Sequence, residues 1–382
     1  MRSSTPLRAG TAAVITTVAT VCPVFLVGGL SVQIEHELRF STSGLGLAVA
    51  AYFTASALAS FSSGLLVERV GSRFVGRIAI GLAAGSLAMI AIAAHSYWSL
   101  VLLMAIAGPA NSLGQLSSNA LLARKVPARR QGLMFGVKQA AIPLSTTLAG
   151  LAVPVIALTV GWRWGFVAAA VLAALAWFVL PGPEDAAPRP RPVARRPQAA
   201  LVVVTIAAAL GATAANPIGS FIADYAVHQG MSESAAGLNL TLGGFAGLTA
   251  RVGVGWLADR RDGGRLTMVS IMLGVGAAGL ALLNAPTVWA IPIGTVAGFA
   301  LGWAWPGLLN FAVTLKFAEA PAAATGVTQI GVYLGGALGP LAFGAMVDGW
   351  SYATAWWIMA ILMAAGAVTM VWGRRMLLRA TS

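Results

Sequence analysis

Apolar stretches recur along the whole chain, each about 20 residues long and separated from the next by a short polar break. As a helix, such a stretch crosses a hydrocarbon layer of about 30 Å, because each residue adds about 1.5 Å. Only 9% of the 382 residues are charged and 58% are hydrophobic, whereas a soluble protein carries about a quarter charged residues. The sequence therefore predicts an all-α membrane protein with twelve transmembrane helices, near residues 11–30, 44–66, 74–94, 98–120, 133–156, 163–181, 199–221, 236–257, 266–285, 288–311, 324–346 and 353–373.

The basic residues predict the orientation of these helices. With both termini in the cytoplasm, almost all loop arginines and lysines face inward, and the outward loops keep only Arg39 and Arg163. This is the positive-inside bias of plasma membrane proteins, and it assigns the net charge of +13 to lipid headgroups rather than to nucleic acid. An aromatic belt is expected at the outer interface, made of Trp98, Trp162, Trp164, Trp289, Trp350, Trp356 and Trp357.

The two halves of the chain are repeats of each other. Gly64–Arg73 (GLLVERVGSR) matches Gly255–Arg265 (GWLADRRDGGR), half a chain away, and Gly136 to Gln139 matches Gly326 to Gln329 at nearly the same offset. The proline- and arginine-rich stretch between the halves suits a solvated connector. We expect a six-helix bundle over residues 1–181, a cytoplasmic linker over 182–198 and a second six-helix bundle over 199–382, related by an axis along the membrane normal.

With these features the chain resembles the major facilitator superfamily. The segments Gly64–Arg73 and Gly255–Arg265 are two charged turns between predicted spans. The first is similar to the signature of that family, Gly-x-Leu-Ala-Asp-Arg-x-Gly-Arg-Lys, with Glu68 in place of the aspartate, and the second departs from the signature after Arg260. The resemblance implies a transporter that rocks between inward-open and outward-open states. Within the family, the pattern is weakly similar to the cyanate and 2-nitroimidazole transporter branch.

The charged turns are expected to latch the two halves together in one conformation. Glycine permits close helix approach, and an acid at a helix end can pair with an arginine or with the N-terminus of a facing helix. The alternative is that these charges only set topology. The expected latch residues are Gly64, Glu68, Arg69, Arg73, Gly255, Asp259 and Arg260.

Two charges lie well inside predicted spans, and both are basic: Lys138 and Arg251. A charge in this position costs about 3 kcal/mol or more on insertion scales, so each is a candidate for function. Neither has an obvious carboxylate partner inside the membrane, and an anionic substrate would supply the missing charge. Alternatively, both side chains snorkel to the interface, or Arg251 braces Asp259.

Uncharged polar residues form helical stripes in the spans that the resemblance implies as cavity-lining. Many such residues serve only as glue between membrane helices. Together with the two cations, they give the expected substrate-binding set of Lys138, Gln139, Arg251, Asn111, Gln115, Asn216, Trp303, Asn310, Gln329 and Tyr333.

The sequence predicts a secondary active or facilitative transporter of a small organic anion, working as a monomer in the bilayer with protons or a counter-anion as possible coupling partners. No metal-ligand spacing, phosphate loop or nucleophile motif occurs, so we expect no enzyme activity, metal or cofactor. A proton-coupled drug or metabolite efflux antiporter is the first alternative, since Gly335-Gly336-Ala337-Leu338-Gly339-Pro340 is related to a motif of such exporters. A membrane sensor of the same fold without transport is the second.

Overall fold

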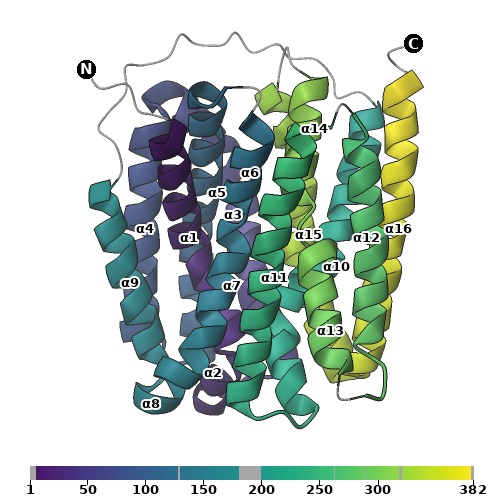
Figure 1. The fold of residues 1–382 in the computed structure, drawn as a ribbon. Helices are drawn as coiled ribbons and strands as arrows, with labels where there is room; N and C mark the ends of the chain where they lie inside the picture. Colours follow the sequence, from purple (N-terminus) through teal and green to yellow (C-terminus); the bar gives the residue numbers. More distant parts are fainter. Residues whose placement is uncertain are drawn as a thin grey trace.

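A computed structural model describes residues 6–127, 130–179, 199–261, 263–287, 289–317 and 321–379. In this part of the chain every regular element is a helix (Figure 1). The expected linker at 182–198 lies outside the described residues.

Residues 6–179 form the first group of helices. Pro23 lies inside the first of them, and Gly71 joins the third to the fourth with a φ of 90°, a backbone conformation that favours glycine. The group consists of α1 (Pro6–Gly29), α2 (Ser31–Leu38), α3 (Thr42–Val70), α4 (Ser72–Ala93), α5 (Tyr97–Lys125), α6 (Gln131–Gln139), α7 (Ala141–Ala152), the π-helix η2 (Val153–Ala157), α8 (Leu158–Val160) and α9 (Trp162–Val179).

Residues 199–379 form the second group. Here too a long helical run is interrupted: the stretch from Ala290 to Lys316 changes from α-helix to π-helix and then to a turn before α-helix resumes at Pro306. The group consists of α10 (Ala199–His228), α11 (Glu233–Asp259), α12 (Arg265–Leu282), α13 (Ala290–Ala297), the π-helix η3 (Gly298–Gly302), α14 (Pro306–Lys316), α15 (Pro321–Gly349) and α16 (Tyr352–Arg379).

Ten helical stretches among the described residues are long and apolar enough to cross a membrane. The expected spans near 163–181 and 236–257 are not among them. The apolar part of α9 is short, and α11 carries Arg251 together with several glycines and two threonines, which lower its hydropathy. Both nevertheless run alongside the other helices in Figure 1, so a total of twelve spans remains a prediction.

Several helices extend beyond the expected spans. Glu35 and Glu37 fall between the expected spans near 11–30 and 44–66, but they lie on the short helix α2, whose buried face includes Ile34 and Val32. Asp224 falls beyond the expected span near 199–221, but α10 continues to His228 and places Asp224 inside its last two turns. Hydropathy underestimates such ends because polar residues continue a helix where it leaves the apolar layer.

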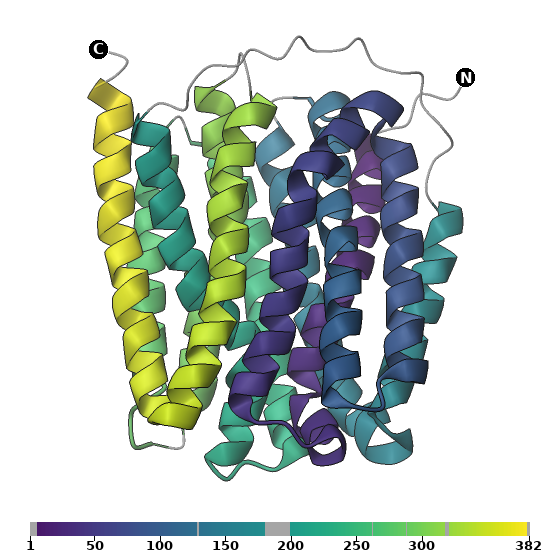
Figure 2. The same cartoon turned by 180° about the vertical axis from the view of Figure 1, so that it is seen from behind.

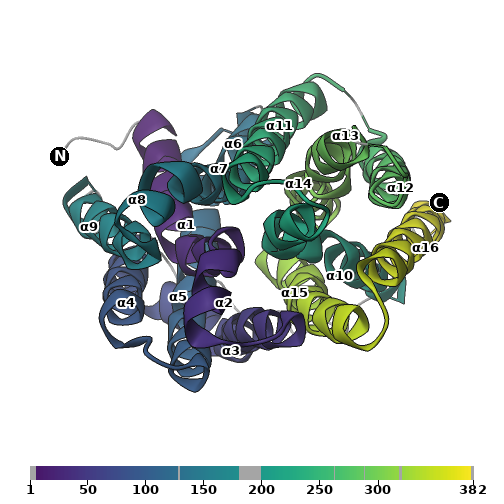
Figure 3. The same cartoon turned by 90° about the horizontal axis from the view of Figure 1, so that it is seen from below.

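The two groups of helices lie side by side when the molecule is viewed along its long axis (Figure 3). α1 begins and α16 ends at one end of the bundle, which we call the termini end, and α2 marks the opposite end, the α2 end (Figure 1). Contacts between the groups run mainly through three helix pairs: α6 with α11, α7 with α11, and α3 with α15. The pair of α3 and α15 is visible from behind in Figure 2.

Glycines let the two groups approach closely. A Cβ added to Gly237 on α11 would lie 2.7 Å from the carbonyl oxygen of Gly150 on α7, and one added to Gly46 on α3 would lie 2.4 Å from that of Pro340 on α15. Both distances are too short for a real side chain. The seams between the groups therefore depend on small residues, as in other membrane helix pairs.

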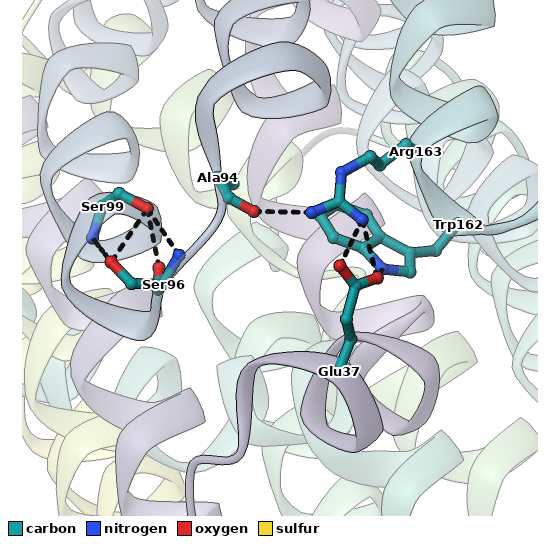
Figure 4. Close-up of polar contacts among 6 residues, drawn as sticks. All are labelled: Glu37, Ala94, Ser96, Ser99, Trp162 and Arg163. Atoms are coloured by element: carbon teal, nitrogen blue, oxygen red, sulfur yellow. Dashed lines mark hydrogen bonds and ion pairs between the residues drawn. The ribbon is translucent and has the colours of Figure 1, made fainter.

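At the α2 end, a polar cluster joins three helices of the first group (Figure 4). Arg163 Nη1 on α9 donates to the carboxylate of Glu37 at 2.5 and 2.6 Å, while its Nη2 donates to the Ala94 carbonyl, just after α4, at 2.8 Å. Trp162 Nε1 donates to the same carboxylate at 2.7 Å. Nearby, Ser96 and Ser99 form a capping box at the start of α5.

This cluster corrects part of the expected aromatic belt. Trp98, Trp164, Trp289, Trp350 and Trp357 are exposed, but Trp162 and Trp356 are buried. Trp162 is turned inward by its hydrogen bond to Glu37, and Trp356 packs against Phe343 and Tyr225.

Candidate functional site

A cavity of about 60 Å³ lies between the two groups of helices. A single water molecule needs about 10–15 Å³ by the same measure, so in this conformation the space suits a few waters or a very small ligand. Both groups contribute to its walls, which are mainly apolar with several amides and one guanidinium. The lining residues are Val21, Phe25, Phe53, Asn111, Gln115, Gln139, Ile142, Ala212, Asn216, Arg251, Trp303, Trp305, Pro306, Gln329, Val332 and Tyr333.

Prolines open the backbone next to this cavity. Pro143 has no N–H, so the carbonyl of Gln139, four residues earlier, has no helical partner. Pro306 likewise leaves the Gly302 carbonyl free, and the indole Nε1 of Trp305 donates to it at 3.0 Å. These breaks expose backbone acceptors in the middle of the bundle.

Arg251 on α11 binds the freed carbonyl of Gln139 and a second carbonyl in the interrupted stretch of the second group. Its Nη1 donates to Gln139 at 2.6 Å, and its Nη2 donates to Trp303, in the turn between η3 and α14, at 2.5 Å. The guanidinium also lies 5.5 Å from the centroid of the Trp303 ring. Its Nε has no hydrogen-bond partner among the described residues, and the side chain is only 2% exposed.

Lys138 on α6 is fully buried directly behind the cavity wall. Its Nζ donates to Oε1 of Gln115 on α5, which itself lines the cavity. Lys138 and Arg251 are close enough for their charges to repel each other. The alternative that these side chains snorkel to the interface is wrong for both residues, because neither side chain reaches the surface.

No acidic residue lines the cavity in the part of the chain that the structure describes. The described acids lie towards the ends of the bundle, on or next to the helix termini. Of the two buried cations, Arg251 lines the cavity and Lys138 lies behind its wall, and no described carboxylate in the lining balances their charges.

Asp259, at the end of α11, binds the first turn of α6. Its carboxylate accepts hydrogen bonds from the backbone amides of Gly132 at 2.9 Å and Leu133 at 2.8 Å. These are amides that a helix N-terminus leaves without an internal partner, and the helix dipole adds a favourable charge interaction. At the other end of α6, Arg251 donates to the carbonyl of Gln139. α11 therefore binds both ends of α6, through the carboxylate of Asp259 at the N-terminus of α6 and through the guanidinium of Arg251 at its C-terminus.

Glycines bring the two helices together between these contacts. A Cβ on Gly255 would lie 2.7 Å from the Gly132 carbonyl oxygen, and one on Gly136 would lie 2.6 Å from that of Arg251. The possible brace between Arg251 and Asp259 is not formed, since each residue binds α6 instead.

A sequence model of the Major Facilitator Superfamily matches residues 12–320 and, in a second match, residues 201–376. The chain belongs to the major facilitator superfamily. It is therefore a multi-pass membrane protein of a family of transporters, as its apolar helices also indicate.

Most residues predicted from the superfamily resemblance and the polar stripes meet at the cavity. Gln139, Arg251, Asn111, Gln115, Asn216, Trp303, Gln329 and Tyr333 all line it. Lys138 is one layer behind, and Asn310 is buried on α14 outside the lining.

The predicted latch residues of this superfamily signature are placed unequally. In the second copy, Gly255 and Asp259 contact α6, whereas Arg260 stacks on Trp256 of its own helix at 3.8 Å. In the first copy, no described atom lies within 4 Å of a Cβ on Gly64, Arg69 is exposed and Arg73 lines a small polar hollow. The side chain of Glu68 lies outside the described residues.

The apolar walls were missed from the sequence. Phe25, which packs edge-on against Trp303 at 5.4 Å, and Trp305 are indistinguishable by type from core or lipid-facing residues. Pro306 was the available signal for Trp305, because a proline within a predicted span marks a break where side chains can turn inward.

Proposed function

We propose that this protein transports small organic anions across the plasma membrane. The observation that carries the proposal is the pair of buried cations, Lys138 and Arg251, beside a cavity whose described lining contains no acid. A negatively charged substrate would balance them, and the apolar walls would hold its carbon skeleton.

Alternating access by two six-helix bundles, residues 1–181 and 199–382, is the proposed mechanism. The second family match begins at residue 201, near the start of α10, as a repeated half would. The glycine seams and the contact of Asp259 with α6 are then the surfaces that open and close. In the proposed orientation the termini end is cytoplasmic, which follows from the basic residues gathered in the loops of that end.

Coupling is proposed to involve the substrate itself. Since no described carboxylate lines the cavity, a proton would enter bound to the substrate, or a second anion would leave in exchange. The weaker resemblance to the cyanate and 2-nitroimidazole branch stays a prediction.

Flux into proteoliposomes tests the role of Lys138. We expect Lys138→Met to reduce uptake of short and aromatic carboxylates about 10-fold or more, because a charge-assisted hydrogen bond contributes about 1.5–3 kcal/mol. Lys316→Met is the matched control, since Lys316 is exposed at the end of α14. Equal uptake by Lys138→Met and wild type would contradict the proposal.

The same vesicles distinguish the alternatives. Drug efflux would appear as transport of lipophilic cations, which two buried positive charges should repel. A sensor would bind anions without carrying them. Either result, with no carboxylate flux, would replace anion transport as the function.

A further inference from the structure

The hydrogen-bond partners of the cavity amides fix which atom of each amide is left without a partner in the protein. The hydroxyl of Ser56 on α3 has a single hydrogen. Its Oγ donates this hydrogen to the carbonyl oxygens of Tyr52 and Gly108, which lie 2.9 and 2.8 Å away. It can therefore only accept from Asn111, whose Nδ2 lies 3.3 Å away. The Oδ1 of Asn111, on a side chain that is 2% exposed, is left as an acceptor with no partner among the described residues.

Two further amides are oriented in the same way. Asn216 Nδ2 donates to the Ala212 carbonyl at 2.8 Å, so its Oδ1 is the atom available to a ligand. Gln115 accepts from Lys138 through Oε1, because an ammonium can only donate, and its Nε2 is therefore a free donor group. The cavity thus presents both kinds of polar atom.

Donors and acceptors are separated by about one helical turn. Gln115, backed by Lys138, lies four residues after Asn111 on α5, so their side chains start about 5–6 Å apart on one face. Arg251 adds its unpartnered Nε as a further donor. The acceptor oxygens come from Asn111 and Gln139 in the first group of helices and from Asn216 in the second.

A plain carboxylate does not satisfy this arrangement, because its oxygens are acceptors and would leave the asparagine oxygens without partners. An ammonium group would supply donors, but two buried cations and the lack of a described acid in the lining make it unfavourable. A hydroxyl supplies a neutral donor.

We propose that the substrate is a hydroxycarboxylate, with its carboxylate toward Gln115, Lys138 and Arg251 and its hydroxyl donating to Asn111 or Asn216. The inference rests on the proposed anion transport and names its substrate class. Discrimination follows from the unpaired oxygens: a deoxy analogue leaves a buried acceptor unsatisfied, which is costly.

Matched pairs of acids test the inference in proteoliposomes: lactate with propionate, 3-hydroxybutyrate with butyrate and 4-hydroxybenzoate with benzoate, each corrected for flux into protein-free vesicles. We expect wild type to transport the hydroxylated member of at least one pair about 10-fold better. The pair with the largest ratio reports the distance between the carboxylate and hydroxyl subsites.

Two variants assign the preference to the asparagines. Asn111→Leu and Asn216→Leu remove the acceptors, and at least one should bring the ratio for that pair to about 2-fold or less, whatever its effect on the flux of both acids. Asn239→Leu is the control, because Asn239 is a buried amide outside the lining that bonds to Thr295. Ligand-induced shifts in the melting temperature of the purified variants give a second readout that does not depend on transport rate.

The outcomes separate the two proposals. Carboxylate flux that depends on Lys138 but shows no hydroxyl preference in any pair would overturn this inference and leave anion transport standing. A preference that persists in both asparagine variants would also overturn it. Lack of flux for both members of every pair would contradict anion transport, and the hydroxycarboxylate assignment with it.

Discussion

Glu35 and Glu37 lie two residues apart on α2, yet their carboxylates respond to opposite surroundings. Burial, followed by the negative charges of Asp224 and Asp348, raises the pKa of Glu35 to about 7. Burial acts the same way on Glu37, but its hydrogen bonds to Arg163 and Trp162 outweigh it and leave the pKa below the ordinary value. One short helix thus carries a carboxylate that resists ionisation and another that favours it.

These shifts predict a pH dependence of stability. Because the folded protein binds the Glu35 proton more tightly than the unfolded chain, the free energy of unfolding falls as pH rises from about 4.5 to about 7, and the penalty is fully present above 7. Glu35→Gln should therefore lose part of the difference in melting temperature between pH 5.5 and pH 8 in detergent.

Glu37→Gln is the control for this effect. Glu37 is ionised throughout that range, so its loss should lower the melting temperature equally at both pH values. The decrease should be small, because an exposed ion pair such as that with Arg163 contributes at most about 1 kcal/mol to the free energy of unfolding. An unchanged pH profile in Glu35→Gln would contradict the prediction.

Among individual residues, hydropathy was enough to find Lys138 and Arg251, since a charge inside an apolar span stands out. It could not identify what they bind. The carbonyls that receive Arg251 exist because Pro143 and the break before Pro306 interrupt helices, and only the packed structure brings these breaks to α11.

Among the helices, the start of α6 is capped by a residue of the other group. Its first amides bind Asp259, so we expect Asp259→Ala to weaken the seam with α11 by about 1 kcal/mol, as the loss of a helix cap does. A difference of this size shifts a two-state equilibrium about 5-fold towards opening at the termini end.

Cysteine labelling measures that shift. The only cysteine of the chain is Cys22, so Cys22→Ser gives a cysteine-free background in which Phe135→Cys, at a buried position on α6, reports on opening. Labelling should be faster with Asp259→Ala but not with Arg260→Gln, because Arg260 stacks on Trp256 rather than binding across the seam. Equal rates in all three backgrounds would rule out a latch at Asp259.

Helix positions were largely predictable, and helix interruptions were not. The apolar runs located each long helix to within a few residues, with α10 the main exception. The turn at Trp303 and the π-helices η2 and η3 lie inside apolar runs whose hydropathy does not reveal a change in helix type, and only prolines such as Pro306 mark these places.

For the whole molecule, the glycine contacts between the two groups of helices predict at which positions a larger side chain would prevent the groups from closing. At the α2 end, a Cβ on Gly237 would lie 2.7 Å from the Gly150 carbonyl oxygen and 2.8 Å from the Val153 Cβ, so Gly237→Leu should hold that end apart and abolish transport. Gly253→Leu, on the same helix with nothing within 4 Å, should transport normally. Uptake by both variants, normalised to folded protein, is the measurement, and normal uptake by Gly237→Leu would show that the seam tolerates separation.

The internal repeat predicted matching halves, but not that the two charged turns would be used differently. Asp259 is bound to α6, whereas no described atom approaches Gly64. Similar sequence specifies similar helices, while the contacts between halves depend on the conformation that the molecule occupies.

The two cations beside the cavity differ in freedom of movement. Arg251 is anchored through two of its nitrogens to carbonyls that have no helical partner, so displacing it would leave both unsatisfied in a dry interior. Lys138 has a flexible four-carbon side chain and a single hydrogen-bond partner, the amide of Gln115. A bound anion could replace that partner without leaving the ammonium unpaired. Under the proposed function, Arg251 is therefore the fixed positive charge beside the cavity, and Lys138 is the positive charge that can move with a bound anion.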